Sequence, residues 1–384
     1  MEKCVIKDGK ILRCGITTGT CAAAGAKAAA SILLGEDIVT SAYIMTPAGI
    51  GVDVPIVEST VLDNSVTCVV KKDAGDDPDI TDGILIYVTV CKSKADITIL
   101  GGRGVGKVTK KGLDQPPGEY AINSVPRKMI TDAVSEVMDR FGYSGGISVT
   151  ISIPEGEAIA VKTFNPRLGI EGGISIIGTS GIVEPMSNKA LIDTILVTQK
   201  ILVNKEKEYK DTLDMLITPG NYGQAFASKN LGLSLDEHIS SSNFIGDTIS
   251  QAVNLGFKRI LIVSHIGKFV KLGIGVTNTH SSFGDGRMET IIACALRAGA
   301  SIDVLRKVSD CVMTDAALSI LYEAGIMSET MDILRHKVSD TITRLVPEDI
   351  EIGFVCFTND ESLGLSDGIL FKSDNAEKLM KIWK

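Results

Sequence analysis

A glycine-rich segment carries the first pattern that suggests chemistry. Residues 101–108, GGRGVGKV, contain GxxxxGK, whose N–H groups and lysine bind nucleotide phosphates when serine or threonine follows. Val108 replaces that hydroxyl, and a glycine and two prolines follow too soon for the helix that the motif needs. The sequence therefore disfavours a phosphoryl-transfer enzyme. Two alternatives stay open: a loop that presents Arg103 and Lys107 to another anion, or a plain surface loop.

Three threonines form a second candidate site. Thr17, Thr18 and Thr20 precede an alanine-rich run that ends before Gly35, a pattern typical of a helix that starts at the threonines. Free N–H groups, the positive end of the helix dipole and three hydroxyls together suit a carboxylate or a phosphate. Ordinary capping is the alternative, although it needs only one threonine.

Two arginines could serve the same anion chemistry. The spacing of apolar residues predicts a helix over 123–142, with Arg127 and Lys128 in its first turn. Cations there oppose the helix dipole by ~0.3–1 kcal/mol each, so neighbouring acids or a bound polyanion should compensate. Arg167, in the predicted loop FNPRLG, is a similar candidate.

The turn PGNYG at 219–223 follows a short apolar strand and opens a predicted helix. An open α/β sheet binds the adenosine part of a cofactor at such a turn, and a later acid, here Asp247, suits the ribose hydroxyls. A tight turn without a ligand is the alternative. The candidate contacts in this turn are Gly220, Asn221, Tyr222 and Gly223.

His265 follows the apolar run RILIVS at 259–264, which predicts a buried strand. It would lie at the carboxyl end of that strand, which is the ligand edge of a parallel sheet. Because the unperturbed pKa of imidazole is near neutrality, His265 is the candidate general base. No nucleophile-elbow or Ser-His-Asp pattern accompanies it.

The composition disfavours several classes of protein. A net charge of −8 and 5% aromatic residues argue against nucleic-acid binding. The eight cysteines form no CxxC pair and the four histidines have no zinc-type spacing, so we expect no metal site.

No apolar run is long enough to span a membrane, and the first ten residues are not an apolar leader. We therefore expect reduced thiols and a cytoplasmic protein.

The elements that must position these residues fall into two groups. With 384 residues, of which 44% are hydrophobic, the chain suits two domains. Residues 1–203 combine strand-type runs, including 158–163, with helices, which predicts an α+β domain with a mixed sheet. The charged stretch 204–211, NKEKEYKD, marks the boundary. Residues 204–384 alternate strands and helices, which predicts an α/β domain with a parallel sheet and a last strand at 352–357.

Several of these segments, in order, resemble the cobalt-precorrin-5B C1-methyltransferase family (CbiD-type) of anaerobic cobalamin biosynthesis. The longest are LRCGITTGTCAAAGAKAA at 12–29 and FNPRLGIEGGISIIGTSGIVEPMS at 164–187. The others are GGRGVGKVTKKGL at 101–113, PPGEYAINSVPRKMI at 116–130, PGNYG at 219–223 and HIGKFVKLGIGVTNTHS at 265–281. Three residues depart from the family pattern: Tyr120, Ser124 and Ser264. These departures are expected to change only the rigidity of the loops that contain them.

The resemblance implies that S-adenosylmethionine donates a methyl group to ring carbon C1 of a cobalt-bearing corrinoid, giving cobalt-precorrin-6A. It implies a corrinoid-binding α+β domain and a Rossmann-like second domain with the S-adenosylmethionine site; the cobalt belongs to the substrate. The anionic macrocycle needs dispersed N–H and cationic contacts. Their candidates are Thr17, Thr18, Thr20, Arg103, Lys107, Arg127 and Arg167. A tetrapyrrole carrier or channelling protein without turnover is the alternative, and a homo-oligomer stays open.

Overall fold

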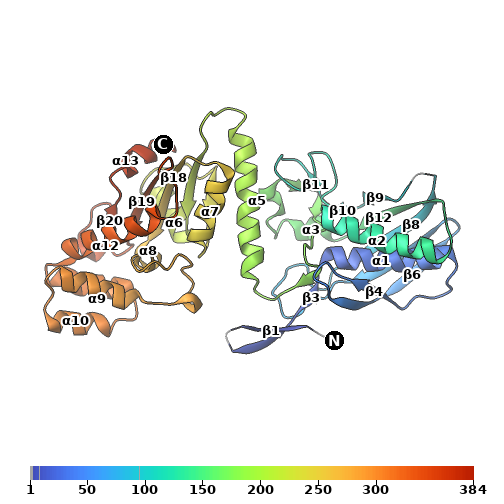
Figure 1. Ribbon diagram of the computed structural model, residues 1–384, viewed down its shortest axis with the longest axis horizontal. Helices are drawn as coiled ribbons and strands as arrows, with labels where there is room; N and C mark the ends of the chain where they lie inside the picture. Colours follow the sequence, from blue (N-terminus) through green and yellow to red (C-terminus); the bar gives the residue numbers. More distant parts are fainter. Residues whose placement is uncertain (1–2, 8, 95) are drawn as a thin grey trace. The chain divides into compact units, whose positions relative to one another are not determined.

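The computed structural model describes residues 3–7, 9–94 and 96–384 (Figure 1). The chain divides into two compact units, Met1–Asn188 and Lys189–Lys384. The boundary predicted at 203/204 falls instead in the last turn of helix α5 (Asn188–Glu206). The charged stretch that suggested this boundary therefore begins inside a helix of the second unit.

A five-stranded sheet forms the centre of the first unit. Its order is β6-β7-β8-β12-β9, and every pair is antiparallel except β12–β9. The strands are β6 (Glu58–Leu62), β7 (Ser65–Lys71), β8 (Leu85–Ser93), β12 (Gly146–Ser152) and β9 (Thr98–Gly101). Helices α1 (Thr18–Leu34) and α2 (Ser124–Arg140) pack on each other, and α1 packs on β7 and β8 (Figure 1). The predicted mixed sheet is confirmed.

Helix α1 owes its position to small residues. Residues 22–30 contain seven alanines, one glycine and Lys27, and the seven alanines are completely buried. A Cβ on Gly25 would lie 2.7 Å from a methyl group of Val88 on β8. The helix axis therefore lies closer to the sheet than larger side chains would permit. Thr17 caps the helix and Gly35 ends it, as predicted.

Short elements surround this core. The paired strands are β1 (Cys4–Lys7) with β2 (Lys10–Arg13), β3 (Gly15–Ile16) with β15 (Ile182–Val183), β4 (Ser41–Met45) with β5 (Gly51–Pro55), β10 (Gly104–Val105) with β14 (Gly173–Ile174), and β11 (Lys107–Val108) with β13 (Ile170–Glu171). Two short helices are α3 (Gly156–Ala160) and α4 (Asn165–Leu168).

The strand predicted over 158–163 is wrong, because this segment begins inside helix α3. Ala160 is buried, but Ala158 and Val161 are exposed, so the apolar residues do not form one buried face of a strand. A Cβ on Gly156 would lie 2.0 Å from the carbonyl oxygen of Gly104. This close approach, which joins residues far apart in the sequence, fixes the turn instead.

A second five-stranded sheet forms the centre of the second unit. Its order is β17-β16-β18-β19-β20, with every pair parallel except β19–β20. The strands are β16 (Asp214–Thr218), β17 (His238–Ser240), β18 (Arg259–His265), β19 (Glu351–Phe357) and β20 (Ile369–Lys372). In chain order this is 2-1-3-4-5, whereas the Rossmann sheet has 3-2-1-4-5-6. The predicted parallel sheet is confirmed for four strands, but β19 is not the last strand.

Helices cover both faces of this sheet. Alternate strand residues point to opposite faces, and they fall into two separate apolar clusters. Helices α6 (Asn221–Lys229) and α13 (Ala376–Met380) belong to one cluster. The other includes α5, α7 (Ile245–Leu255), α8 (Ile266–Leu272), α9 (Arg287–Arg297), α10 (Ile302–Ser309), α11 (Thr314–Glu323) and α12 (Met327–Thr343). Among the described residues, no helix has the length and apolar character needed to cross a membrane.

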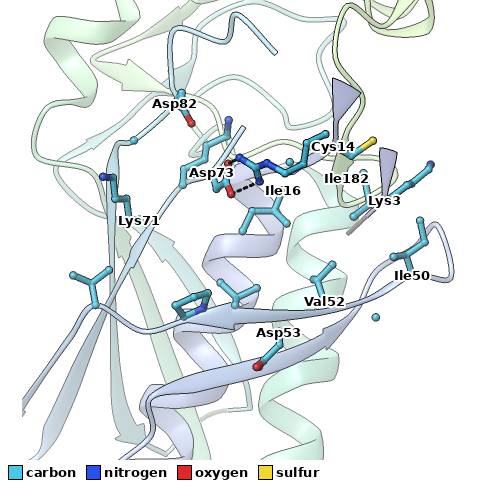
Figure 2. A pocket seen from close by; sticks show the side chains of 18 residues that line it. Lys3, Cys14, Ile16, Ile50, Val52, Asp53, Lys71, Asp73, Asp82 and Ile182 are labelled. Atoms are coloured by element: carbon cyan, nitrogen blue, oxygen red, sulfur yellow. Dashed lines mark hydrogen bonds and ion pairs between the residues drawn. The ribbon is translucent and has the colours of Figure 1, made fainter. Parts of the chain in front are cut away.

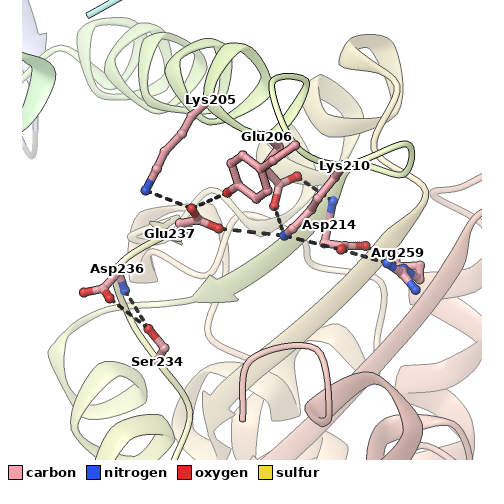
Figure 3. A network of polar contacts seen from close by, with 9 residues as sticks. Lys205, Glu206, Lys210, Asp214, Ser234, Asp236, Glu237 and Arg259 are labelled. Carbon is pink, nitrogen blue, oxygen red and sulfur yellow. Dashed lines mark hydrogen bonds and ion pairs between the residues drawn. The ribbon is translucent and has the colours of Figure 1, made fainter.

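A network of ion pairs joins the amino ends of β16 and β18 (Figure 3). Lys210 Nζ lies 2.6 Å from Glu206 Oε1 and 3.6 Å from Asp214 Oδ2. The Arg259 guanidinium donates to both Asp214 oxygens, at 2.5 and 2.8 Å. Glu206 and Asp214 are 0% and 1% exposed. Lys210 and Arg259 thus compensate two buried carboxylates at this edge of the sheet.

Candidate functional site

The chain changes its direction of winding between β16 and β18. After β16 it passes through α6 to β17 on one side, whereas after β18 it goes on to β19 on the other. Open α/β sheets bind ligands outside the carboxyl ends of their strands at such a switch point. The PGNYG turn follows β16, and His265 ends the neighbouring β18. The structure therefore brings together two candidate segments that are distant in the sequence.

The turn itself requires glycine. Gly220 has φ 86° and begins α6 without a side-chain cap. A Cβ on Gly223 would lie 2.7 Å from the carbonyl oxygen of Val263. Asn221 and Tyr222 are exposed, and the Tyr222 and His265 ring centroids are 6.0 Å apart. The first turn of α6 can therefore be approached without hindrance from a side chain at Gly220.

Asp247 lies at the same edge of the sheet, one strand further along. It occupies the first turn of α7, the helix that follows β17, and its side chain is exposed. A carboxylate in a first helical turn also suits the helix dipole, so its position alone does not require a ligand.

His265 ends β18 and caps helix α8. Its Nδ1 accepts from the Gly267 N–H at 3.1 Å, and its Nε2 lies 3.8 Å from Asp315 Oδ1. Burial lowers the pKa of His265, while Asp315 opposes this effect, so the ring is neutral near pH 7. Because Nδ1 holds the lone pair that accepts the cap hydrogen bond, the ring hydrogen is on Nε2. This arrangement favours hydrogen-bond donation over proton abstraction.

Lys268 lies near His265 in the sequence and was not a candidate site residue in the sequence analysis. It is half-buried on α8, and its Nζ donates to the Ser242 carbonyl oxygen at 2.8 Å. Burial, together with the charge of Lys271, lowers the pKa of Lys268 to about 8. The sequence did contain one indication of its importance: it is a lysine in an apolar helix that directly follows the carboxyl end of a strand. Its contact with Ser242 was not visible, because it joins residues 26 positions apart.

Two buried hydroxyls at the same edge lack a hydrogen-bond partner. Thr218 is the last residue of β16, and Ser241 follows the last residue of β17. Both residues are completely buried, and neither Oγ atom has a partner among the described residues. Buried polar atoms normally have one, so these two mark a place where a polar ligand or water would be accommodated.

The three threonines of the first unit serve internal contacts. Thr17 Oγ1 accepts from the Thr20 N–H at 3.2 Å, which is ordinary capping. Thr18 Oγ1 accepts from the Ile177 N–H at 2.9 Å, and Thr20 Oγ1 donates to the Gly181 carbonyl at 2.6 Å. The two further hydroxyls, which capping alone does not need, therefore hold the segment around 177–181 against the helix start.

The start of helix α2 is also compensated from within. Asp114 accepts from the Ser124 N–H at 2.5 Å and from its hydroxyl at 2.8 Å. The Arg127 guanidinium donates to the carbonyl oxygens of Ile122 and Ile99, at 2.9 and 3.2 Å. Lys128 Nζ is 2.8 Å from Asp132. Neighbouring acids and carbonyls, rather than a bound polyanion, thus account for these cations.

The glycine-rich segment has no phosphate-binding geometry. Residues 101–108 contain the end of β9 and the short strands β10 and β11, and the next helix begins only at Ser124. The Gly102 and Gly106 N–H groups donate to the carbonyl oxygens of Ile151 and Ile174. The side chains of Arg103, Lys107 and Arg167 are exposed. Lys107 Nζ lies 5.0 Å from the Tyr120 ring centroid.

An open pocket of about 730 Å³ lies elsewhere in the first unit (Figure 2). The aliphatic side chains of Ile16, Val52 and Ile182 are among those that line it. Charges of both signs surround it, and Arg13 pairs with Asp73 at 2.6 and 2.8 Å. None of the predicted site residues lines it. Among the described residues, no three His, Cys, Asp or Glu side chains gather as a metal site.

Comparisons with known proteins identify the family. The family model described as CbiD matches residues 5–185, and the model of the CbiD C-terminal domain matches residues 278–367. A protein of Ruminiclostridium cellulolyticum named cobalt-precorrin-5B C(1)-methyltransferase is 44% identical over 381 residues, covering 99% of this chain and 98% of that protein. One of the same name from Alkaliphilus metalliredigens is 39% identical over 385 residues, covering 100% and 98%. The chain belongs to the CbiD family.

A solved structure is also similar. The crystal structure of the cobalamin biosynthesis protein CbiD from Archaeoglobus fulgidus shares 29% identity and covers 72% of this chain and 84% of that one, with a TM-score of 0.39.

Proposed function

We propose that the chain is a cobalt-precorrin-5B C(1)-methyltransferase that uses S-adenosylmethionine and produces cobalt-precorrin-6A. The observation that carries this proposal is the match to the R. cellulolyticum protein of that name, which covers both chains almost from end to end at 44% identity. Because the match includes both units, it extends to the switch point of the second sheet and to the exposed cations of the first unit.

The residues at the switch point fit the donor. S-adenosylmethionine, when bound, supplies an electrophilic methyl group on a sulfonium. Gly220 leaves the start of α6 accessible, the exposed Tyr222 ring offers a surface for adenine, and Asp247 offers a carboxylate for the ribose hydroxyls. The partnerless Thr218 and Ser241 hydroxyls also suit a polar ligand. In this sense the second unit is Rossmann-like, since it obeys the same switch-point rule with a different strand order.

The first unit would bind the corrinoid through its exposed cations. Arg103, Lys107 and Arg167 can each reach a carboxylate of the macrocycle, and arginine does so through two parallel hydrogen bonds. Thr17, Thr18, Thr20 and Arg127 would act indirectly, because their polar atoms already hold the surrounding segments in place.

Alignment is the main requirement of the reaction. Methyl transfer is a displacement in which the ring carbon, the methyl group and the sulfur lie in line. Fixing such a geometry can contribute up to ~7–11 kcal/mol. We assign His265 to this task as a hydrogen-bond donor through Nε2, in place of the base role that its residue type suggested, since its Nδ1 is occupied by the Gly267 N–H.

Two variants of His265 separate capping from imidazole chemistry. We expect His265→Ala to leave the donor dissociation constant within about threefold and to lower turnover by about 10- to 100-fold. His265→Asn retains an oxygen that can cap Gly267 N–H, so it should restore thermal stability without restoring turnover. Donor titration, steady-state rates and melting temperatures measure these effects. Lost donor binding in the alanine variant, or full activity in the asparagine variant, would contradict this role.

A direct test of the function is a single-turnover assay. The purified full-length protein is incubated anaerobically with cobalt-precorrin-5B and methyl-labelled S-adenosylmethionine, and the corrinoid is analysed by mass spectrometry and NMR. We expect one labelled methyl group at C1. If the corrinoid binds but receives no methyl group, the protein is a carrier; if it does not bind, the proposed substrate is wrong.

A further inference from the structure

The Lys268 ammonium lies close to the Gly220 turn. Its Nζ reaches the Ser242 carbonyl oxygen at 2.8 Å, on the loop that follows β17. A Cβ built on Gly220, on the loop that follows β16, would lie 3.5 Å from the same Nζ. The ammonium of α8 therefore lies where the loops of three neighbouring strands meet, next to the first turn of α6.

This ammonium is not compensated by a carboxylate. Within the described part of the chain, no acidic side chain lies within 4.0 Å of Lys268 Nζ, whereas Lys271 on the same helix has Asp285 at 3.6 Å. Burial and, after it, the positive charge of Lys271 on the same helix both disfavour the charged form of Lys268, which lowers its pKa. Because buried charges are normally paired, an anionic ligand at this place would supply the missing negative charge.

Independent observations at the same edge also indicate a ligand. The Thr218 and Ser241 hydroxyls are buried and without partners among the described residues; Thr218 ends β16, and Ser241 follows the last residue of β17. Helix α6 has nine residues and no side chain caps its amino end. A single ammonium beside one helix start matches a single negative charge, rather than the several charges of a polyphosphate.

We propose that Lys268, with the first N–H groups of α6, binds the carboxylate of the donor's amino-acid part and so sets the position of the methyl group. The inference rests on the proposed function for the identity of the donor. It makes Lys268 a donor-binding residue that also discriminates between donors with and without a carboxylate. A carboxylate of the corrinoid is the other source of the same chemistry, and the experiment distinguishes the two.

The test compares S-adenosylmethionine with its decarboxylated analogue in calorimetric titrations of the full-length protein. We expect Lys268→Met to weaken S-adenosylmethionine binding by about 10- to 100-fold and to change the binding of the analogue by less than about threefold. Lys268→Arg keeps the charge and should retain most of the affinity. Lys229→Met, which removes an exposed lysine at the other end of α6, is the matched control and should bind both compounds normally.

The outcomes separate this inference from the proposed function. Wild-type protein that binds neither compound would overturn the donor assignment and this inference with it. Wild-type protein that binds S-adenosylmethionine, together with a Lys268→Met variant that is equally weakened for both compounds or for neither, would overturn the inference alone. Corrinoid titrations followed by absorbance complete the test, because weakened corrinoid binding with unchanged donor binding would assign Lys268 to the substrate. Melting temperatures verify that each variant is folded.

Discussion

Replacing Lys210 with methionine is expected to lower the free energy of unfolding of the second unit by about 2–4 kcal/mol. Lys210 Nζ is shared between the buried carboxylates of Glu206 and Asp214 (Figure 3). Without it, Arg259 still pairs with Asp214, but Glu206 loses the ammonium that lies 2.6 Å from its carboxylate. The value is below the usual loss for a fully buried pair because 26% of the Lys210 side chain is exposed.

The single tryptophan makes this measurement specific. Trp383 is buried in the second unit, so its fluorescence during urea denaturation reports on that unit alone. Lys205→Met is the matched control: Lys205 belongs to the same network but is 56% exposed and pairs with Glu237. Its removal should change the free energy of unfolding by no more than about 1 kcal/mol. Equal losses in the two variants would contradict the assigned role of Lys210.

The loss in the Lys210 variant should also depend on pH. Burial raises the pKa of Glu206, while Lys210 opposes this effect. At pH values between the pKa of Glu206 in the unfolded chain and its higher pKa in the folded protein, the folded protein binds more protons than the unfolded chain. The contribution of Glu206 to stability therefore falls as pH rises through this range. Removing Lys210 raises the folded pKa further. The destabilisation should therefore be greater at about pH 8 than at about pH 5.

Replacing Gly220 with valine is expected to raise the dissociation constant of S-adenosylmethionine by at least about 100-fold. At φ 86° a β-branched residue is strongly disfavoured, and its Cβ would lie 3.5 Å from Lys268 Nζ. Relief of this strain must move the start of α6, the Lys268 ammonium or both. Calorimetric titration of the full-length variant measures the effect.

Gly232→Val provides the control for backbone strain. Gly232 has φ +65° in the same unit, but nothing lies within 4 Å of a Cβ at that position. Both variants should lose stability by about 1–3 kcal/mol from strain, as reported by Trp383 fluorescence. Only Gly220→Val should lose donor binding while still binding the corrinoid. Equal donor binding in the two variants would show that the turn is not part of the donor site.

The elements that the sequence predicted well have local signals. Thr17 caps the amino end of helix α1 and Gly35 its carboxyl end, so a capping residue and a helix-ending glycine stand in the expected places. Helix α12 was not predicted: its buried Met331, Leu334 and Val338 have helical spacing, but no side chain caps its amino end. The strand predicted over 158–163 is wrong because apolar residues alternate there although the segment begins inside helix α3.

The candidate site shows where such signals stop. The Gly220 turn was predictable because its glycine pattern and its flanking strand are adjacent in the sequence. Lys268 was not, because its significance depends on Ser242 and Gly220, which belong to other loops. The chemistry of His265 was equally hidden. Its residue type suggests a base, whereas the hydrogen bond from Gly267 N–H determines which nitrogen carries the hydrogen.

The alanine-rich body of α1 has a consequence for how this protein tolerates change. Each of the seven buried alanines is already close to the smallest residue available, so nearly every substitution adds volume to a packed layer, and glycine instead weakens the helix. Evolution can adjust most cores by exchanging one large residue for another, but here that route is closed. A saturation scan of the chain should therefore find in this helix the longest run of residues that do not tolerate substitution, because their small size is what the packing requires.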